Sequence, residues 1–133
     1  RRFQIRGGIA HAFNGSLQQA KAFIDLGFVL GFGGTLTFDR ALQIRRLATQ
    51  LSLSNIVLET DAPDIPPHWL YRTQSERQLG AIQISQNRNE PCQLPKIAEV
   101  LAQLRNESLS EIAQATVQNT LRVLPQLQSL QTV

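Results

Sequence analysis

The sequence lacks the features of secreted and membrane proteins. It has a single cysteine, Cys92, among its 133 residues. One cysteine excludes an internal disulfide and favours a reducing compartment, so we expect a cytoplasmic protein. No apolar run approaches the ~20 residues of a membrane span. The N-terminal stretch RRFQIRGGIA also lacks the apolar core of a signal peptide.

Methionine is absent altogether, and the chain begins at Arg1. We therefore expect either a processed protein or a fragment of a longer one. The content of 42% hydrophobic and 17% charged residues is typical of a soluble globular chain, with a length that suits one domain. A net charge of +3 only weakly favours an anionic partner.

Short apolar segments alternate with amphipathic segments in the first half of the chain. Ser16 and Gln19 form a capping-box pattern at the start of the first amphipathic segment, and Gly27 follows its end. Alternating strands and helices with short connections are typical of right-handed βαβ units and a parallel sheet. The pattern predicts strands over 7–13, 28–32 and 55–60, and helices over 17–26 and 39–51.

The second half has a different pattern. Residues 62–93 form a long polar segment, and loops of this length are usually functional or disordered. Within it, Trp69 and Tyr71 could stack on a base or pack against the domain, while His68 is expected at the surface. The remaining predicted helices cover 75–79, 94–105 and, after a second capping box at Ser108 and Glu111, 109–124.

Three parallel strands do not close a sheet. Parallel strands are normally buried on both faces, and each open edge invites pairing. A (β/α)8 TIM barrel typically needs about 250 residues, roughly twice the length of this chain. A flavodoxin-like sheet would need more strands. We therefore expect an α/β chain that forms the C-terminal part of a larger protein.

Two candidate metal ligands lie at the ends of predicted strands. His11 lies in the first strand, and Asp61 directly follows the third. The carboxyl ends of parallel strands face the active site, so both side chains are expected at one rim. Either residue alone is also typical of a core or a turn. Together they favour a metal or proton-transfer role, with zinc, manganese, iron or magnesium as the ion, although two ligands are too few for a zinc site.

A second carboxylate, Glu59, stands close to Asp61 in the segment IVLETDAPD. Side chains alternate along a strand, so the two share a face unless the strand ends between them. Their repulsion could be offset by a nearby cation, or by a hydrogen bond that Glu59 accepts from the backbone or from the region of Arg88. Glu59 could also simply cap a neighbouring loop.

Weaker candidates for substrate binding lie in loops. Gly33 and Gly34 follow the second strand and could let backbone amides approach a phosphate, although glycines here are also common in turns. Arg88 and Asn89 could bind the phosphate end of a substrate, because the guanidinium fork pairs with two oxygens. The same two residues could instead lead into a turn at Pro91.

Four motifs occur in order along the chain: HAFNGS (11–16), GFGG (31–34), LETDAP (58–63) and RNEP (88–91). Their order and spacing resemble the C-terminal half of the TatD family of metal-dependent deoxyribonucleases, over almost the whole chain. The resemblance implies an amidohydrolase-like TIM barrel with a one- or two-metal centre. Residues 1–133 would then be the C-terminal portion of a single hydrolase domain, with barrel strands six, seven and eight.

The resemblance also implies roles for individual residues. His11 matches a metal-ligand histidine, and Asp61 matches an aspartate that binds metal and orients or deprotonates the attacking water. Glu59 matches a glutamate that supports the ligands, and Asn119 matches a position where a structural hydrogen bond is expected. The family's His-x-His pair, a glutamate and another histidine would precede Arg1, so we expect the isolated chain to be inactive.

The resemblance implies hydrolysis of a phosphodiester, in single-stranded DNA or in another phosphodiester substrate, by water activated at a divalent zinc, manganese or magnesium ion. Two alternatives stay open: an amide or ester hydrolase on the same scaffold, and a non-catalytic barrel fragment that self-associates through its open edges. The expected partners are the nucleic acid and the missing N-terminal half of the barrel, with no membrane.

Overall fold

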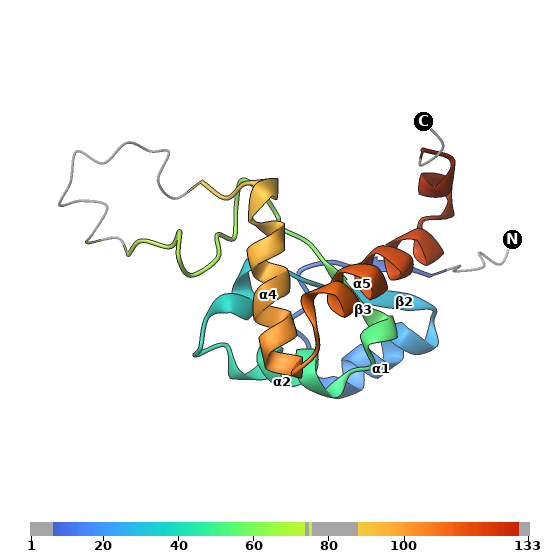
Figure 1. The fold of residues 1–133 in the computed structure, drawn as a ribbon. Helices are drawn as coiled ribbons and strands as arrows, with labels where there is room; N and C mark the ends of the chain where they lie inside the picture. The colour runs from blue at the N-terminus through green and yellow to red at the C-terminus, as the bar shows by residue number, and fades with distance from the viewer. Residues whose placement is uncertain (1–6, 74, 76–87, 131–133) are drawn as a thin grey trace, which may run out of the picture.

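The computed structural model describes residues 7–73, 75 and 88–130 (Figure 1). Three parallel strands form one sheet in the order β1-β2-β3: β1 (Gly8–Ala10), β2 (Phe28–Phe32) and β3 (Ile56–Leu58). Ala10 is paired with Leu30, and Phe32 with Leu58. The predicted parallel α/β arrangement is confirmed, and the carboxyl ends of all three strands meet at one edge.

Within the described residues, four longer helices flank the sheet, with α5 in front of the strands and α1 below them in Figure 1. Both predicted capping boxes are present, at Ser16 and at Ser108, and Gly27 follows α1 with φ +84°. The helices are α1 (Leu17–Asp25), α2 (Leu42–Gln50), α4 (Leu94–Arg105) and α5 (Leu109–Val123), and the 3-10 turns are η1 (Gly34–Thr37), η2 (Leu53–Asn55), η4 (Pro91–Gln93) and η5 (Pro125–Leu130). The helix predicted over 75–79 lies outside the described residues except for Ser75.

Several predicted boundaries were too wide. The first strand ends at Ala10, so His11 lies just beyond it, because Ala12 takes the left-handed conformation with φ +47°. The third strand likewise ends at Leu58, and Asp61 has φ +53°. The second helix begins at Leu42 instead of residue 39, since the preceding residues form a turn. Strand alternation therefore does not decide how Glu59 and Asp61 are oriented.

The hydrophobic core lies between the sheet and the helices. Leu30, Phe32 and Ile56 point from the strands toward the helices, where they join Leu101 of α4 and Ile112 of α5. All five side chains are essentially inaccessible to solvent. Burying such side chains typically contributes about 1.5–3 kcal/mol each. The core therefore fixes the strand ends from which the candidate site is built.

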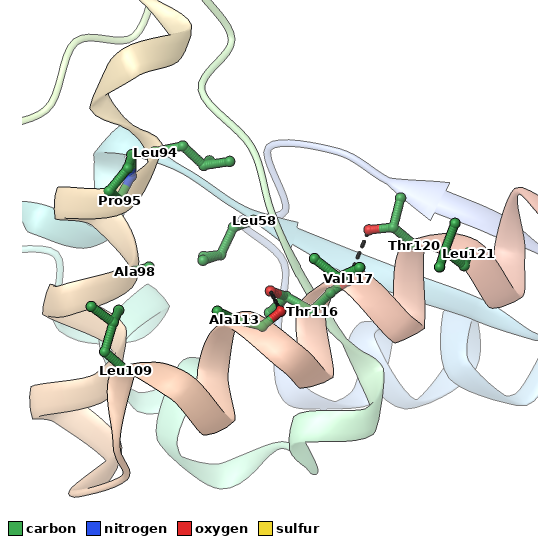
Figure 2. A pocket seen from close by; sticks show the side chains of 10 residues that line it. All are labelled: Leu58, Leu94, Pro95, Ala98, Leu109, Ala113, Thr116, Val117, Thr120 and Leu121. Atoms are coloured by element: carbon green, nitrogen blue, oxygen red, sulfur yellow. Dashed lines mark hydrogen bonds between the residues drawn. The ribbon is translucent and has the colours of Figure 1, made fainter. Parts of the chain in front are cut away.

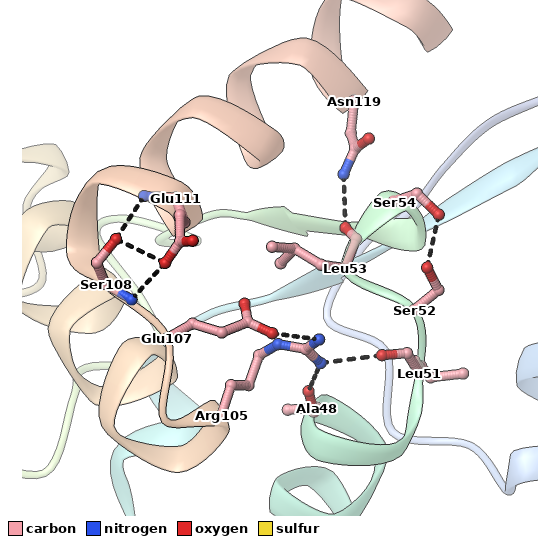
Figure 3. A network of polar contacts seen from close by, with 10 residues as sticks. All are labelled: Ala48, Leu51, Ser52, Leu53, Ser54, Arg105, Glu107, Ser108, Glu111 and Asn119. Atoms are coloured by element: carbon pink, nitrogen blue, oxygen red, sulfur yellow. Dashed lines mark hydrogen bonds and ion pairs between the residues drawn. The ribbon is translucent and has the colours of Figure 1, made fainter.

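Two polar side chains connect distant segments inside the fold (Figure 3). The Arg105 guanidinium donates to the carbonyls of Ala48 (2.7 Å) and Leu51 (2.9 Å), which belong to the last turn of α2 and its C-cap. The Asn119 amide donates to the carbonyls of Leu53 and Ile56, both at 2.8 Å. The predicted structural hydrogen bond of Asn119 is confirmed, and it joins α5 to the start of β3.

The apolar face of α5 is only partly covered. Ile112 and Thr116 are buried, but Val117 remains 51% exposed. A groove of about 380 Å³ runs between α4 and α5, with Leu58 of β3 at its base and Leu94 and Val117 on its sides (Figure 2).

Within the described residues, no helix is both long and apolar enough to span a membrane.

Candidate metal centre

His11, Glu59 and Asp61 converge at the carboxyl edge of the sheet. One potential ligand atom of each lies within 4.8 Å of the others. His11 Nδ1 is 3.5 Å from Asp61 Oδ1. The expected meeting of His11 and Asp61 at one rim is observed, because His11 follows β1 and Asp61 follows β3, whose carboxyl ends lie on the same edge of the sheet. The His11 side chain is 76% exposed and that of Asp61 21%, so the cluster opens toward solvent.

Glu59 is oriented by the protein backbone. Its Oε1 accepts a hydrogen bond from the backbone N–H of Ala12, the residue after His11. Of the alternatives left open by the sequence, a backbone contact is the one observed. The contact ties the loop after β1 to the end of β3, which places the Glu59 carboxylate beside His11 and Asp61.

Gly31 makes room for this carboxylate, a role that the sequence analysis did not predict. A Cβ at position 31 would lie 2.2 Å from Glu59 Oε2, so the strand passes directly beside the carboxylate. The available signal was a glycine inside an apolar strand, which often marks a close approach of another group. Glycines 33 and 34 are packed against backbone: a Cβ on Gly33 would meet the carbonyl oxygen of Glu59 at 2.9 Å, and one on Gly34 that of Ile65 at 2.4 Å.

The donor set of the cluster suits a divalent ion. One imidazole and two carboxylates are the ligands that zinc, manganese and iron accept, and carboxylates also suit magnesium. Asp61 lines a cleft of about 190 Å³ together with Ala12, Gly31 and Gly33. His11, Glu59 and Asp61 could therefore hold a metal ion that small ligands reach from solvent.

The electrostatics of the cluster centre on Glu59. Burial raises the pKa of its carboxyl above the ordinary value of 4.5. The hydrogen bond from Ala12 lowers the pKa, the charge of Asp61 raises it, and His11 lowers it, with the net shift upward. Without a cation, ionisation of Glu59 is therefore less favourable in the folded chain than in water, which is the expected property of a site that gains from binding positive charge.

The raised pKa predicts a pH-dependent stability of the metal-free chain. A carboxyl with a higher pKa when folded stabilises the fold below its unfolded pKa, near 4.5, and this contribution is lost as pH rises through the folded pKa. Glu59→Gln mimics the protonated form at every pH. In a chelator-containing buffer we expect it to melt at a higher temperature than wild type near pH 7, with the difference shrinking toward pH 4.5. Thermal melts followed by circular dichroism measure this.

Glu99→Gln is the matched control, because Glu99 is exposed on α4 and its substitution removes the same charge. A Glu59→Gln variant that is less stable than wild type at neutral pH would contradict the prediction.

Asn89 and Arg88 occupy different environments. Asn89 is buried, and its Nδ2 donates to the carbonyls of Thr60, Asp64 (2.8 Å) and Ile65 (3.2 Å). Its amide therefore fastens the loop that follows Asp61. Arg88 is exposed and lines a separate cleft with Cys92. Substrate binding by Gly33, Gly34, Arg88 or Asn89 stays a prediction.

The aromatic residues of the long loop are packed to different degrees. Trp69 is half-buried, and its Nε1 donates to Gln93 Oε1 at 2.8 Å. Tyr71 remains 39% exposed and meets the ring of Phe38 edge-on, with centroids 5.6 Å apart. His68 is exposed, as expected. Packing therefore accounts for Trp69, while Tyr71 presents part of its ring to solvent.

Comparison with known proteins places these residues in a family. The family model for TatD related DNase matches residues 1–125. The uncharacterized metal-dependent hydrolase YjjV of Escherichia coli is 43% identical over 115 residues, which are 86% of this chain and 39% of that protein. The 3'-5' ssDNA/RNA exonuclease TatD of Pectobacterium parmentieri is 30% identical over 121 residues, which are 90% of this chain and 43% of that protein.

The fold agrees with that placement. The crystal structure of E. coli YjjV, described as a TatD homolog, superposes with a TM-score of 0.71 and 40% sequence identity, covering 89% of this chain and 40% of that one. The chain thus spans about two fifths of the length of these relatives. From its sequence match and its fold alike, this chain belongs to the TatD related DNase family.

Proposed function

We propose that residues 1–133 are the C-terminal portion of a (β/α)8 barrel that hydrolyses phosphodiesters with a divalent metal ion. The outer strands β1 and β3 each have a free edge within the described residues, and parallel strands are normally paired and covered on both sides. Relatives named as a metal-dependent hydrolase and as an exonuclease on single-stranded DNA and RNA support this activity. The proposed substrate is single-stranded DNA, and the single cysteine favours a cytoplasmic location.

The observation that carries the proposal is the cluster of His11, Glu59 and Asp61 within 4.8 Å. His11 and Asp61 would hold the ion, which is zinc, manganese or magnesium by the chemistry of the donors. When bound, such an ion stabilises negative charge and lowers the pKa of water at the site. The remaining ligands would come from the N-terminal half of the barrel.

The different surroundings of the two carboxylates suit them to different roles. Asp61 lines the open cleft, so its carboxylate can orient water and accept a proton from it. Glu59 is already engaged by the Ala12 N–H. We therefore assign Glu59 a supporting role, in which it fixes the loop that carries His11 and adds negative charge beside the ion.

The apolar groove between α4 and α5 favours a second, non-catalytic property. Exposed Leu94, Leu109 and Val117 line it beside Leu58 of β3. The proposed occupant is the N-terminal half of the barrel. In its absence, the groove and the open edges would promote self-association, which sedimentation of the isolated chain would detect. Nothing in the cluster of His11, Glu59 and Asp61 favours an amide or ester over a phosphodiester as substrate. The alternative of an amide or ester hydrolase is therefore supported only by the shared barrel fold.

A chimera tests the proposed function. In it, this chain replaces the matching segment of YjjV, the relative that is 43% identical. We expect the chimera to degrade single-stranded DNA when supplied with manganese or zinc and to stop on chelation. We expect the isolated chain to bind these ions weakly in calorimetry and to leave the DNA intact. Robust metal-dependent cleavage by the isolated chain, or none by a folded chimera, would contradict the proposal.

A further inference from the structure

A second groove opens beside the cleft that contains Asp61. It has a volume of about 470 Å³, and we call it the Phe38 groove after one of the residues that line it. Asn14, Thr35 and Ile44 line both the Phe38 groove and the Asp61 cleft. The two therefore adjoin, so a chain-like ligand held at the metal cluster has the groove as its neighbouring site.

Two large apolar side chains that line the Phe38 groove, Leu42 and Tyr71, are exposed to solvent. Tyr71 is 39% exposed, and its ring is fixed edge-on against Phe38 at an interplanar angle of 82°. Leu42 is 71% exposed, the highest value among the large hydrophobic side chains of the described residues. An exposed aromatic ring and an exposed leucine facing one cavity suit a planar, weakly polar ligand group such as a nucleobase.

One side of the Phe38 groove is positively charged. Arg40 is exposed, and its Cζ lies 5.8 Å from the centroid of the Phe38 ring. The neighbouring Asp39 pairs with Arg45 instead, at 3.1 Å, and no ion pair involves Arg40 among the described residues. The first turn of α2, which also borders the groove, contains no acidic residue. The Arg40 guanidinium is thus free to pair with a phosphate, which its planar fork fits.

We propose that the Phe38 groove binds one nucleotide of a single-stranded nucleic acid, next to the phosphodiester held at the metal cluster. The base packs on Tyr71 and Leu42, and the phosphate of that nucleotide pairs with Arg40. This inference rests on the proposed function and adds to it a site for substrate outside the metal cluster. Aromatic stacking beside a positive charge is the usual way in which proteins bind single strands without reading their sequence.

Binding without hydrolysis tests the inference. A fluorescently labelled, short single-stranded deoxyoligonucleotide is titrated with the 133-residue chain in chelator, and anisotropy reports the affinity. We expect Tyr71→Ala to weaken binding about tenfold, as for one lost stacking contact, and Tyr71→Phe to retain it. Arg40→Gln is expected to weaken binding and to reduce its dependence on salt, because one phosphate contact is lost.

Two controls separate this site from general attraction to DNA. Arg46→Gln removes the same charge from an exposed position of α2 that does not line the groove, and it should weaken binding less than Arg40→Gln does, because it loses no direct phosphate contact. On an oligonucleotide with abasic sites, the Tyr71→Ala penalty should disappear while the Arg40→Gln penalty remains.

Equal losses for Arg40→Gln and Arg46→Gln with none for Tyr71→Ala would overturn the inference, and so would a wild-type chain that does not bind the oligonucleotide. Neither result touches the proposed function, which depends on hydrolysis by the chimera. A chimera that hydrolyses nothing would, conversely, leave these binding results intact.

Discussion

In the YjjV chimera, Asp61→Asn should lower kcat by at least about 10²-fold, because general-base loss alone is typically worth 10²–10⁴-fold. Asparagine keeps the shape and one acceptor oxygen of Asp61, but it carries no charge and accepts no proton. The backbone at Asp61 has φ +53°, a conformation that asparagine adopts more readily than most residues. Stability should therefore be held, or raised as repulsion with Glu59 is relieved.

Glu59→Gln is the comparison for this variant. Its effect on kcat should be smaller, in the range of about 10–100-fold that is typical of groups supporting metal ligands. Rates on single-stranded DNA, metal content and melting temperature would be measured for both variants. If Asp61→Asn kept near-normal turnover while Glu59→Gln abolished it, the roles of the two carboxylates would be reversed.

Gly31→Ala should weaken metal binding, although Gly31 itself supplies no ligand atom. The added Cβ would lie 2.2 Å from Glu59 Oε2, a separation at which the carboxylate must move. Its contact with the Ala12 N–H would be lost, and the loop that carries His11 would no longer be held in place. We expect metal affinity in the chimera to fall about 10–100-fold, as for other losses of support behind a ligand.

A double variant shows whether this effect passes through Glu59. Gly31→Ala combined with Glu59→Ala should bind metal no more weakly than Glu59→Ala alone, since no carboxylate remains to be displaced. Calorimetric titration with zinc or manganese measures the affinities, and melts in chelator report any loss of packing in β2. Additive losses in the double variant would mean that Gly31 acts through the strand and not through Glu59.

The sequence by itself determined the elements whose signals are local. Both capping boxes, the αL glycine after α1 and the span of α4 depend on residues within a few positions of each other, so they could be read directly. The alternation of strands and helices predicted the parallel sheet, and the sheet placed His11 and Asp61 at one edge. The four motifs carried the family resemblance, which the comparisons confirmed.

Only the tertiary structure decided the details of the site. The first strand ends at residue 10 and not 13 because Ala12 adopts positive φ, and Asp61 likewise adopts positive φ beyond the third strand; no local pattern of apolar residues encodes either conformation. The Ala12–Glu59 contact spans 47 positions in sequence, and the reason for Gly31 becomes visible only once that carboxylate is placed beside it. The Phe38 groove is likewise formed by segments that are distant in sequence: a loop, the start of a helix and Tyr71. Such contacts depend on side chains that packing brings together, and sequence spacing carries little information about them.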